Sequence, residues 1–307
     1  MLTLEQVKER TNYLGSSDCA AILGMSRWKT PLQVWAEKTG AVATEDIRGE
    51  LRIEVGNELE DLVCSLFTKR TGKKVQRVNE IQKHPKYDFI RAQIDRRVVG
   101  EDTLLEAKTC SAWKSKEWIG EEIPQEYILQ VMHQLAVTGK SKGYIAVLIG
   151  GNVDFKWKEI DRDEALIRDI LIKEVDFWNK YVATKTMPQI VTCGDTGILG
   201  QLFPKGNDKA AIQFDDKAIK LIESIKSLEN DKSVVEDMLE LEKNKLRMLL
   251  GENSLGLSDK YKVSWSNQIT NRLDNSKIRK ECPEVYEKYC NKIVSRVLRI
   301  NEINKGE

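Results

Sequence analysis

The sequence is poor in the residues that build disulfide frameworks and zinc sites. It has two histidines, His84 and His133, and no two of its cysteines form a C-x-x-C motif. The six cysteines are dispersed over the chain: Cys19, Cys64, Cys110, Cys193, Cys282 and Cys290. This pattern is typical of reduced thiols in a cytoplasmic protein, and it argues against a zinc site.

Long apolar segments are missing as well. No apolar run approaches the roughly 18 residues of a membrane span, and the first residues lack the apolar core of a signal peptide. We therefore expect a cytoplasmic protein without membrane contact. Hydrophobic residues make up 41% and charged residues 32% of the 307, the balance of one large globular domain or of a domain with an appendage. A net charge of +1 neither favours nor excludes nucleic acid, because basic residues can gather in one channel.

Two strand-forming segments flank residues 100–102, which are predicted to form a hairpin turn. Side chains alternate along a strand, so Glu106 and Lys108 should share one face of the sheet while Ala107 points into the core. The hairpin should bring Asp95 alongside them. Two carboxylates at this separation repel each other unless a divalent cation neutralises them, and Mg²⁺ prefers such oxygen ligands.

An aspartate followed about a dozen residues later by Glu-x-Lys also occurs by chance in charged proteins, so a solvated hairpin is the alternative for this stretch. The surrounding segments decide between the two interpretations. Ser16, Ser17 and Asp18 can each cap the apolar segment 19–23. The serines can equally present N–H groups and hydroxyls to an anion such as phosphate, and the sequence leaves both roles open.

Helices are predicted on both sides of the strand motif. The helix opened by Thr30-Pro31 should end at Gly40. A second helix over residues 47–70 carries Glu60 at the edge of an apolar stripe, where its carboxylate either reaches a site or is solvated. The stripe consists of Leu59, Leu62, Val63, Leu66 and Phe67.

The helix predicted from Pro124 to Thr138 carries a polar stripe of Gln130, His133 and Gln134. A stripe of amides and imidazole without acids suits a face turned toward a charged ligand. Strands at 144–149 and 153–159 and a helix at 162–182 then complete a βαβ-like core.

These motifs together resemble the YqaJ-like viral recombinase family, relatives of the phage lambda exonuclease in the PD-(D/E)XK nuclease superfamily. The resemblance covers residues 1–182 and rests on four motifs in the family's order. They are Arg10…Gly15-Ser16-Ser17-Asp18, Gly56…Glu60, Asp95…Glu106-Ala107-Lys108, and Tyr127…Gln130…His133-Gln134…Thr138-Gly139. One departure is Gln93-Ile94, which stands where many members of the superfamily have a small residue and a proline. The resemblance implies an α/β fold with a restriction-endonuclease-like core, a mixed central sheet flanked by helices, and a helical C-terminal extension.

The resemblance also implies roles for individual residues. Asp95, Glu106 and the Ala107 carbonyl would ligate Mg²⁺, for which Mn²⁺ could substitute, and Glu60 would join through a second metal or a water. Lys108 would orient the attacking water, and Gln130 would hold that water or the scissile phosphate. The expected 5′-phosphate and DNA-binding residues are Arg10, Ser16, Ser17 and Gln93.

The implied function is 5′→3′ digestion of double-stranded DNA ends, leaving 3′ overhangs for a phage single-strand annealing protein. By the same resemblance, a trimeric ring is the oligomer to test. A restriction-like or repair endonuclease on the same core is the alternative enzyme, and an inactive DNA-binding assembly protein is the alternative from another class. A nuclease with an iron–sulfur cluster is disfavoured, because the four-cysteine set that such a cluster needs is absent.

We expect a nuclease domain at residues 1–190, a linker or long loop at 191–213, and a helical, coiled-coil-like region at 214–307. The segment 214–250 could be one helix or a hairpin folded at Asn230-Asp231. Its apolar seam, which Lys232 and Glu242 interrupt, should pack against the nuclease core, a neighbouring subunit or the annealing protein. The seam consists of Leu221, Ile225, Leu228, Val235, Leu239, Leu246 and Leu249. A strand-like segment at 261–265 and short helices follow.

Overall fold

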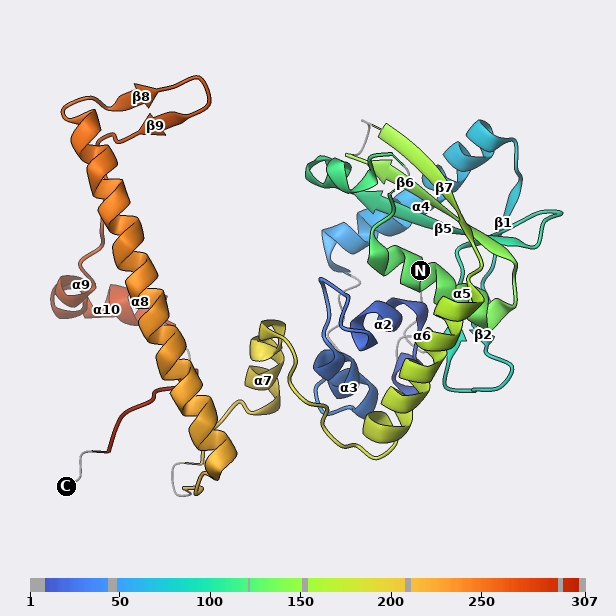
Figure 1. Cartoon of the computed structure of the whole chain (residues 1–307), viewed down its shortest axis with the longest axis horizontal. Coiled ribbons are helices and arrows are strands. Elements are labelled where there is room, and N and C mark those ends of the chain that lie inside the picture. The colour runs from blue at the N-terminus through green and yellow to red at the C-terminus, as the bar shows by residue number, and fades with distance from the viewer. Residues whose placement is uncertain are drawn as a thin grey trace. The chain divides into compact units, whose positions relative to one another are not determined.

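The computed structural model describes residues 9–43, 49–120, 122–150, 154–207, 211–291 and 295–303. The chain divides into two compact units, Met1–Phe203 and Pro204–Glu307 (Figure 1). None of the helices in these described ranges is long and apolar enough to cross a membrane.

A five-stranded mixed sheet forms the centre of the first unit, with the strand order β1-β4-β5-β6-β7. The strands are β1 (Val75–Arg77), β4 (Arg96–Val98), β5 (Thr103–Cys110), β6 (Lys142–Ile149) and β7 (Asp154–Asp161). β5 and β6 are parallel and are connected through α5 (Gln125–Thr138), while the other neighbours are antiparallel. The prediction of a mixed sheet with a βαβ-like core is therefore confirmed.

The strand-forming segment that precedes residues 100–102, predicted near residues 89–99, is interrupted. Its first part is β3 (Arg91–Ala92), which pairs with β2 (Gln82–Lys83) in a separate small sheet. Its second part is β4, which pairs with β5 across the predicted turn. Residues 93–95 belong to neither strand. Asp95 therefore lies immediately before the first residue of β4, outside the regular strand.

Helices cover both faces of this sheet. On one face, α4 (Leu51–Thr71) packs through Val63 and Phe67 against Leu105 and Tyr144. On the other face, α2 (Ser16–Ile22), α5 and α6 (Glu164–Phe177) enclose a second apolar cluster. Leu62, predicted to lie in the apolar stripe of α4, is instead 44% exposed. The predicted start of that helix at residue 47 falls outside the described residues.

The N-terminal segment forms η1 (Arg10–Asn12), α2 and α3 (Pro31–Thr39). α3 begins and ends as predicted, because Thr30 caps its start and Gly40 adopts a left-handed conformation with φ of 69° at its end. The prediction that residues 16–18 supply the cap of α2 is wrong. Gly15 is the capping residue, and the Asp18 side chain accepts a hydrogen bond from its N–H group.

The remaining elements of the first unit are η3, η4, η5 and α7. They span Ala112–Trp118, Trp178–Val182, Cys193–Asp195 and Thr196–Leu202. Ile198 of α7 is buried in a cluster with Leu14 and Leu32. Residues beyond 190 thus contribute to the core of the first unit, whose boundary follows Phe203.

In the second unit, the segment after residue 214 is one continuous helix, α8 (Asp216–Leu250), so the alternative of a helical hairpin is excluded. β8 (Leu255–Leu257) and β9 (Lys262–Ser264) form a hairpin after it. Two short helices, α9 (Asn275–Glu281) and α10 (Pro283–Tyr289), follow. Leu250 is the buried residue of α8.

Candidate active site

Glu106 is a buried carboxylate of the central sheet. It lies on β5, 3% exposed, and three side chains donate hydrogen bonds to it. Lys108 Nζ and Gln130 Nε2 both reach Oε1 at 2.6 Å, and Gln134 Nε2 reaches Oε2 at 2.6 Å. Because hydrogen bonds engage both of its oxygens, the carboxylate is held in one orientation.

Asp95 lies beside Glu106, in the non-strand segment 93–95 between β3 and β4. Its Oδ2 accepts a hydrogen bond of 2.8 Å from the Ala107 N–H group. The N–H and C=O groups of one strand residue point to the same side, so the Ala107 carbonyl also faces Asp95. Burial and the neighbouring Glu106 charge raise the pKa of Asp95 to about 8, although Lys108 and the Ala107 N–H group act against this.

Lys108 is fixed next to both acids. Burial disfavours its charged form, but Glu106 and Asp95 outweigh this and raise the pKa of the ammonium above its ordinary value. Its Nζ also lies 5.3 Å from the centre of the Tyr127 ring. Lys108 is therefore held in its protonated form and donates a hydrogen bond to Glu106.

Glu60 enters the site from α4 and is held by arginines. Arg96 Nη1 donates to Glu60 Oε1 at 2.5 Å and to the Asp95 carbonyl at 2.7 Å, while Nη2 binds Asp61. Arg77 also pairs with Asp61, at 2.9 Å. The guanidinium of Arg96 thereby connects α4 to the loop that carries Asp95, and it sets the distance between two of the candidate acids.

A cavity of about 230 Å³ joins these acids to the N-terminal segment. It is lined by Arg10, Tyr13, Gly15, Ser16, Ser17, Asn57, Glu60, Arg91, Gln93, Asp95, Glu106 and Gln130. All predicted site residues are among them except Ala107 and Lys108, which contact the lining acids directly. The structure thus brings the complete set of predicted side chains to one place.

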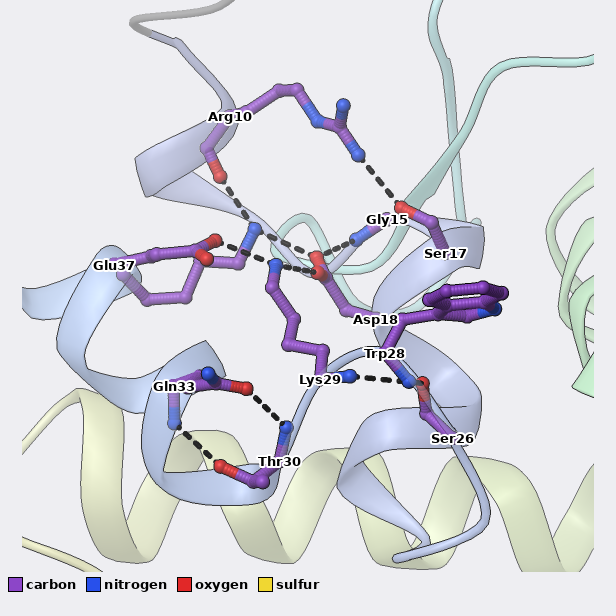
Figure 2. Close-up of polar contacts among 11 residues, drawn as sticks. Arg10, Gly15, Ser17, Asp18, Ser26, Trp28, Lys29, Thr30, Gln33 and Glu37 are labelled. Carbon is purple, nitrogen blue, oxygen red and sulfur yellow. Dashed lines mark hydrogen bonds and ion pairs between the residues drawn. The ribbon is translucent and has the colours of Figure 1, made fainter. Parts of the chain in front are cut away.

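The N-terminal wall of the cavity is built around a buried carboxylate (Figure 2). Asp18, 1% exposed, accepts from the Gly15 N–H group at 3.0 Å and pairs with Lys29 at 3.1 Å and Lys38 at 2.7 Å. Burial alone would raise the pKa of Asp18, but the two ammonium groups outweigh it and hold this pKa far below its usual range. Asp18 therefore stays ionised and ties α2 to α3 and to the loop before α3.

The polar groups that face the cavity depend on this arrangement. Lys38 Nζ donates to the Arg10 carbonyl at 2.7 Å, and Arg10 Nη2 donates to Ser17 Oγ at 2.7 Å (Figure 2). Ser16 Oγ, which is buried, has no hydrogen-bond partner among the residues that the structure describes. A guanidinium, a hydroxyl that it orients and an unpaired buried hydroxyl form a donor set suited to a phosphate group.

His133 does not face this cavity, so the prediction of a polar stripe turned toward a ligand is wrong for this residue. It is fully buried, with Nδ1 2.7 Å from Glu174 Oε1 and Nε2 3.0 Å from the Arg91 carbonyl oxygen. Cys19, His133 and Glu174 place their ligand atoms within 4.8 Å of one another. Because both ring nitrogens already have protein partners, we interpret this group as a polar core network that fixes Arg91, and not as a metal centre.

Several residues of the site do not follow from the sequence patterns. Helical spacing places Gln134 on the correct face without assigning it a role, and no pattern indicates Arg96, Asn57, Arg91 or Tyr13. Arg96 pairs with Leu105 across β4 and β5, so it occupies an inward position. A buried arginine requires acidic partners, and that requirement could have identified it as the residue that holds Glu60.

Comparison with known proteins agrees with this architecture. The description "YqaJ-like viral recombinase domain" fits residues 6–141. The Bacillus subtilis (strain 168) protein named "Uncharacterized protein YqaJ" is 36% identical over 303 residues, which cover 98% of this chain and 94% of that protein. The crystal structure of the alkaline exonuclease LHK-Exo from Laribacter hongkongensis has a similar fold, with a TM-score of 0.51 and 21% identity over 60% of this chain and 94% of that one. Its complex with dAMP gives a TM-score of 0.52 at the same identity and coverage.

Proposed function

The chain belongs to the YqaJ-like viral recombinase family, and from this premise we propose that it is a Mg²⁺-dependent 5′→3′ exonuclease that digests double-stranded DNA from its ends. One observation carries the proposal. A single cavity is lined both by Asp95 and Glu106 and by Arg10 and Ser17. Acids that suit a metal ion and donors that suit a terminal phosphate therefore line the same cavity.

The residues fit Mg²⁺, with Mn²⁺ as a substitute. The Asp95 and Glu106 carboxylates and the Ala107 carbonyl would hold it, and all three offer the hard oxygen ligands that such cations prefer. The mutual repulsion that raises the pKa of Asp95 is what a divalent cation would offset. Glu60, held by Arg96, would contribute through a bound water. When bound, the metal would supply an activated water and stabilise negative charge on the leaving oxygen.

The protein's own groups would perform the remaining work. Lys108 would orient the attacking water and offset charge that develops on the phosphate, because its ammonium is fixed by Glu106. Gln130 lines the cavity and would hold the water or the scissile phosphate with its amide, while Gln134 keeps Glu106 in place. None of these roles requires Lys108 to lose its proton.

The N-terminal wall would convert a general phosphodiesterase into an exonuclease. Arg10 and Ser17, with Ser16 and Gln93, would bind the terminal 5′-phosphate. This contact would set the distance between the end of the strand and the metal. Removal of nucleotides from 5′ ends would leave 3′ single-stranded overhangs. Such overhangs are the substrate of a single-strand annealing protein, which we propose as the partner in phage-type recombination, and a trimeric ring around the DNA remains the oligomer to test for the nuclease unit.

Digestion of linear and covalently closed circular duplex with Mg²⁺ tests the proposal. The wild-type protein should degrade only linear DNA, and Asp95→Asn should degrade neither. Cleavage of the closed circle would favour the endonuclease alternative. Binding without cleavage of either form would favour the inactive DNA-binding alternative and overturn the proposal.

A further inference from the structure

The long helix α8 exposes an apolar seam along most of its length. Leu228 is 64%, Val235 62% and Leu249 82% exposed, and a single residue of this helix is buried. A face of this kind is unfavourable in water, since each large apolar side chain that becomes buried contributes about 1.5–3 kcal/mol. The seam therefore needs an occupant.

The seam repeats every seven residues, which is the pattern of a two-stranded coiled coil. Position a of the repeat is occupied by Ala218, Ile225, Lys232, Leu239 and Leu246, and position d by Leu221, Leu228, Val235, Glu242 and Leu249. Within these positions, Lys232 and Glu242 are the charged residues. Any partner must satisfy both charges as well as cover the leucines.

A parallel pair with a second copy of α8 would not satisfy them. In a parallel coiled coil, each a or d residue faces the same residue of the other helix. Lys232 would then face Lys232 of the second copy, and Glu242 would face Glu242. Two layers of like charge inside a seam oppose this arrangement.

An antiparallel pair centred on Asp237 satisfies both charges. Lys232 and Glu242 are equally far from Asp237 in sequence, so each faces the opposite charge of the second copy. The other layers of the overlap then pair apolar residues: Ile225 with Leu249, Leu228 with Leu246, and Val235 with Leu239 of the second copy, while Ala218 and Leu221 lie N-terminal to the overlap. Every one of these layers joins position a of one helix to position d of the other, as an antiparallel seam requires.

Charges beside the seam favour the same register. In an antiparallel pair, the g positions of the two helices face each other, and so do the e positions. Asp231 and Lys245 are both at position g, so Asp231 lies opposite Lys245 of the second copy. Glu229 and Lys243 are both at position e, so Glu229 lies opposite Lys243 of the second copy. Among the charged residues beside the seam, Glu236 alone meets its own copy near the centre. Moving the helices by one heptad in either direction would place Lys232 against valine or leucine and Glu242 against isoleucine or leucine. The register centred on Asp237 is therefore favoured over its neighbours.

We propose that α8 is a dimerisation element that pairs with α8 of a second copy of this chain as an antiparallel coiled coil centred on Asp237. Asp216, the first residue of α8, precedes Asp237 by 21 residues, so at 1.5 Å per residue the two N-terminal ends of the pair emerge roughly 63 Å apart. This proposal does not depend on the proposed nuclease activity, because its readout is mass.

Charge-reversal variants of the full chain test the pairing, with molecular mass measured by light scattering. Lys232→Glu and Glu242→Lys should each halve the mass of the wild-type assembly, because each variant creates two layers of like charge. The double variant should restore the wild-type mass, and so should a mixture of the two single variants. A wild-type mass of 35.1 kDa, or single variants with unchanged mass, would overturn the proposal and point to an intramolecular partner or another protein.

A matched pair of leucines provides the control. Leu239, 52% exposed, lies in the seam, whereas Leu241, 55% exposed, lies outside it on the same helix. Leu239→Ser should halve the mass and Leu241→Ser should leave it unchanged. Equal effects of the two changes would contradict a specific seam.

Disulfide trapping tests the direction of pairing, after the exposed Cys193, Cys282 and Cys290 are replaced by serine. A mixture of Val235→Cys and Leu239→Cys chains should form a cross-linked dimer, while each chain alone should not. Cross-linking of each chain alone, with none between the two, would show a parallel pair and overturn the antiparallel register.

Discussion

The replacement Asp18→Asn tests the buried charge cluster that supports the N-terminal wall of the cavity. In the folded protein, Asp18 neutralises Lys38, whose side chain is 3% exposed, and Lys29, which is partly buried. An amide of the same size removes the negative charge and leaves both ammonium groups without it. Removal of one partner from a buried ion pair costs roughly 3–5 kcal/mol, so we expect Asp18→Asn to lower the free energy of unfolding by an amount of this order.

The assay is urea unfolding at pH 7, followed by circular dichroism, with Asp61→Asn as the control. Asp61 also pairs with two basic side chains, but its own side chain is 74% exposed, so its replacement should change the free energy of unfolding far less. The double variant Asp18→Asn, Lys38→Met should lose less stability than Asp18→Asn alone, because it leaves fewer unpaired charges. A loss of under about 1 kcal/mol for Asp18→Asn would refute this account of the cluster.

The difference in free energy of unfolding between the wild type and Asp18→Asn should change with pH in one defined direction. The pKa of Asp18 is lowered in the folded state, so the ionised carboxylate stabilises the fold at every pH above the ordinary aspartate pKa. This contribution is lost as the pH falls below that value, toward the lowered pKa. The gap between the wild type and Asp18→Asn should therefore be largest near neutral pH and should shrink below about pH 4. A constant gap from pH 7 to pH 3 would contradict the assignment.

Three further predictions concern catalysis and the division of the chain. Asp95→Asn and Glu106→Gln should each reduce the rate of DNA cleavage by roughly 10²–10³-fold or more. Without metal, Asp95→Asn should have a melting temperature no lower than that of the wild type in a thermal scan, because the change removes repulsion from Glu106. Lys108→Met should lose activity at every Mg²⁺ concentration in a titration, since added metal does not replace a fixed ammonium; recovery at high Mg²⁺ would contradict its role. A chain that ends at Phe203 should remain soluble and cleave DNA in the presence of metal, because it retains α7 with the buried Ile198. An insoluble truncated chain would show that the second unit completes the nuclease fold.

The part of the site that follows from local periodicity could be predicted from the sequence. The two-residue period of a strand was enough to place Glu106 and Lys108 together and Ala107 on the opposite face, and Lys108 indeed contacts Glu106. Helical spacing likewise placed Gln130 and Gln134 on one face, and both bind Glu106. In these cases the backbone geometry alone decides which side chains can meet.

Contacts between distant elements could not be predicted in the same way. The sequence predicted Asp18 as a candidate helix cap. Its partners Lys29 and Lys38 come from outside α2, and their distance from Asp18 depends on how α2 packs on α3. His133 shares a helix with Gln130, yet it turns toward Glu174 because α6 packs against that side of α5. For α8, the heptad pattern predicted a seam, but only the continuity of the helix excluded the hairpin and fixed which charges can face each other.

The measurement that tests the central claim most directly is the time course of nucleotide release from end-labelled linear duplex with Mg²⁺, comparing 5′-phosphate with 5′-hydroxyl ends. The account predicts that the 5′ label is released first, as mononucleotide, and that a 5′-phosphate end is digested faster than a 5′-hydroxyl end. Arg10→Ala should remove most of that difference, because Arg10 and the Ser17 hydroxyl that it holds would bind the terminal phosphate. Release of the 3′ label first, or internal cuts before either label is released, would contradict the claim.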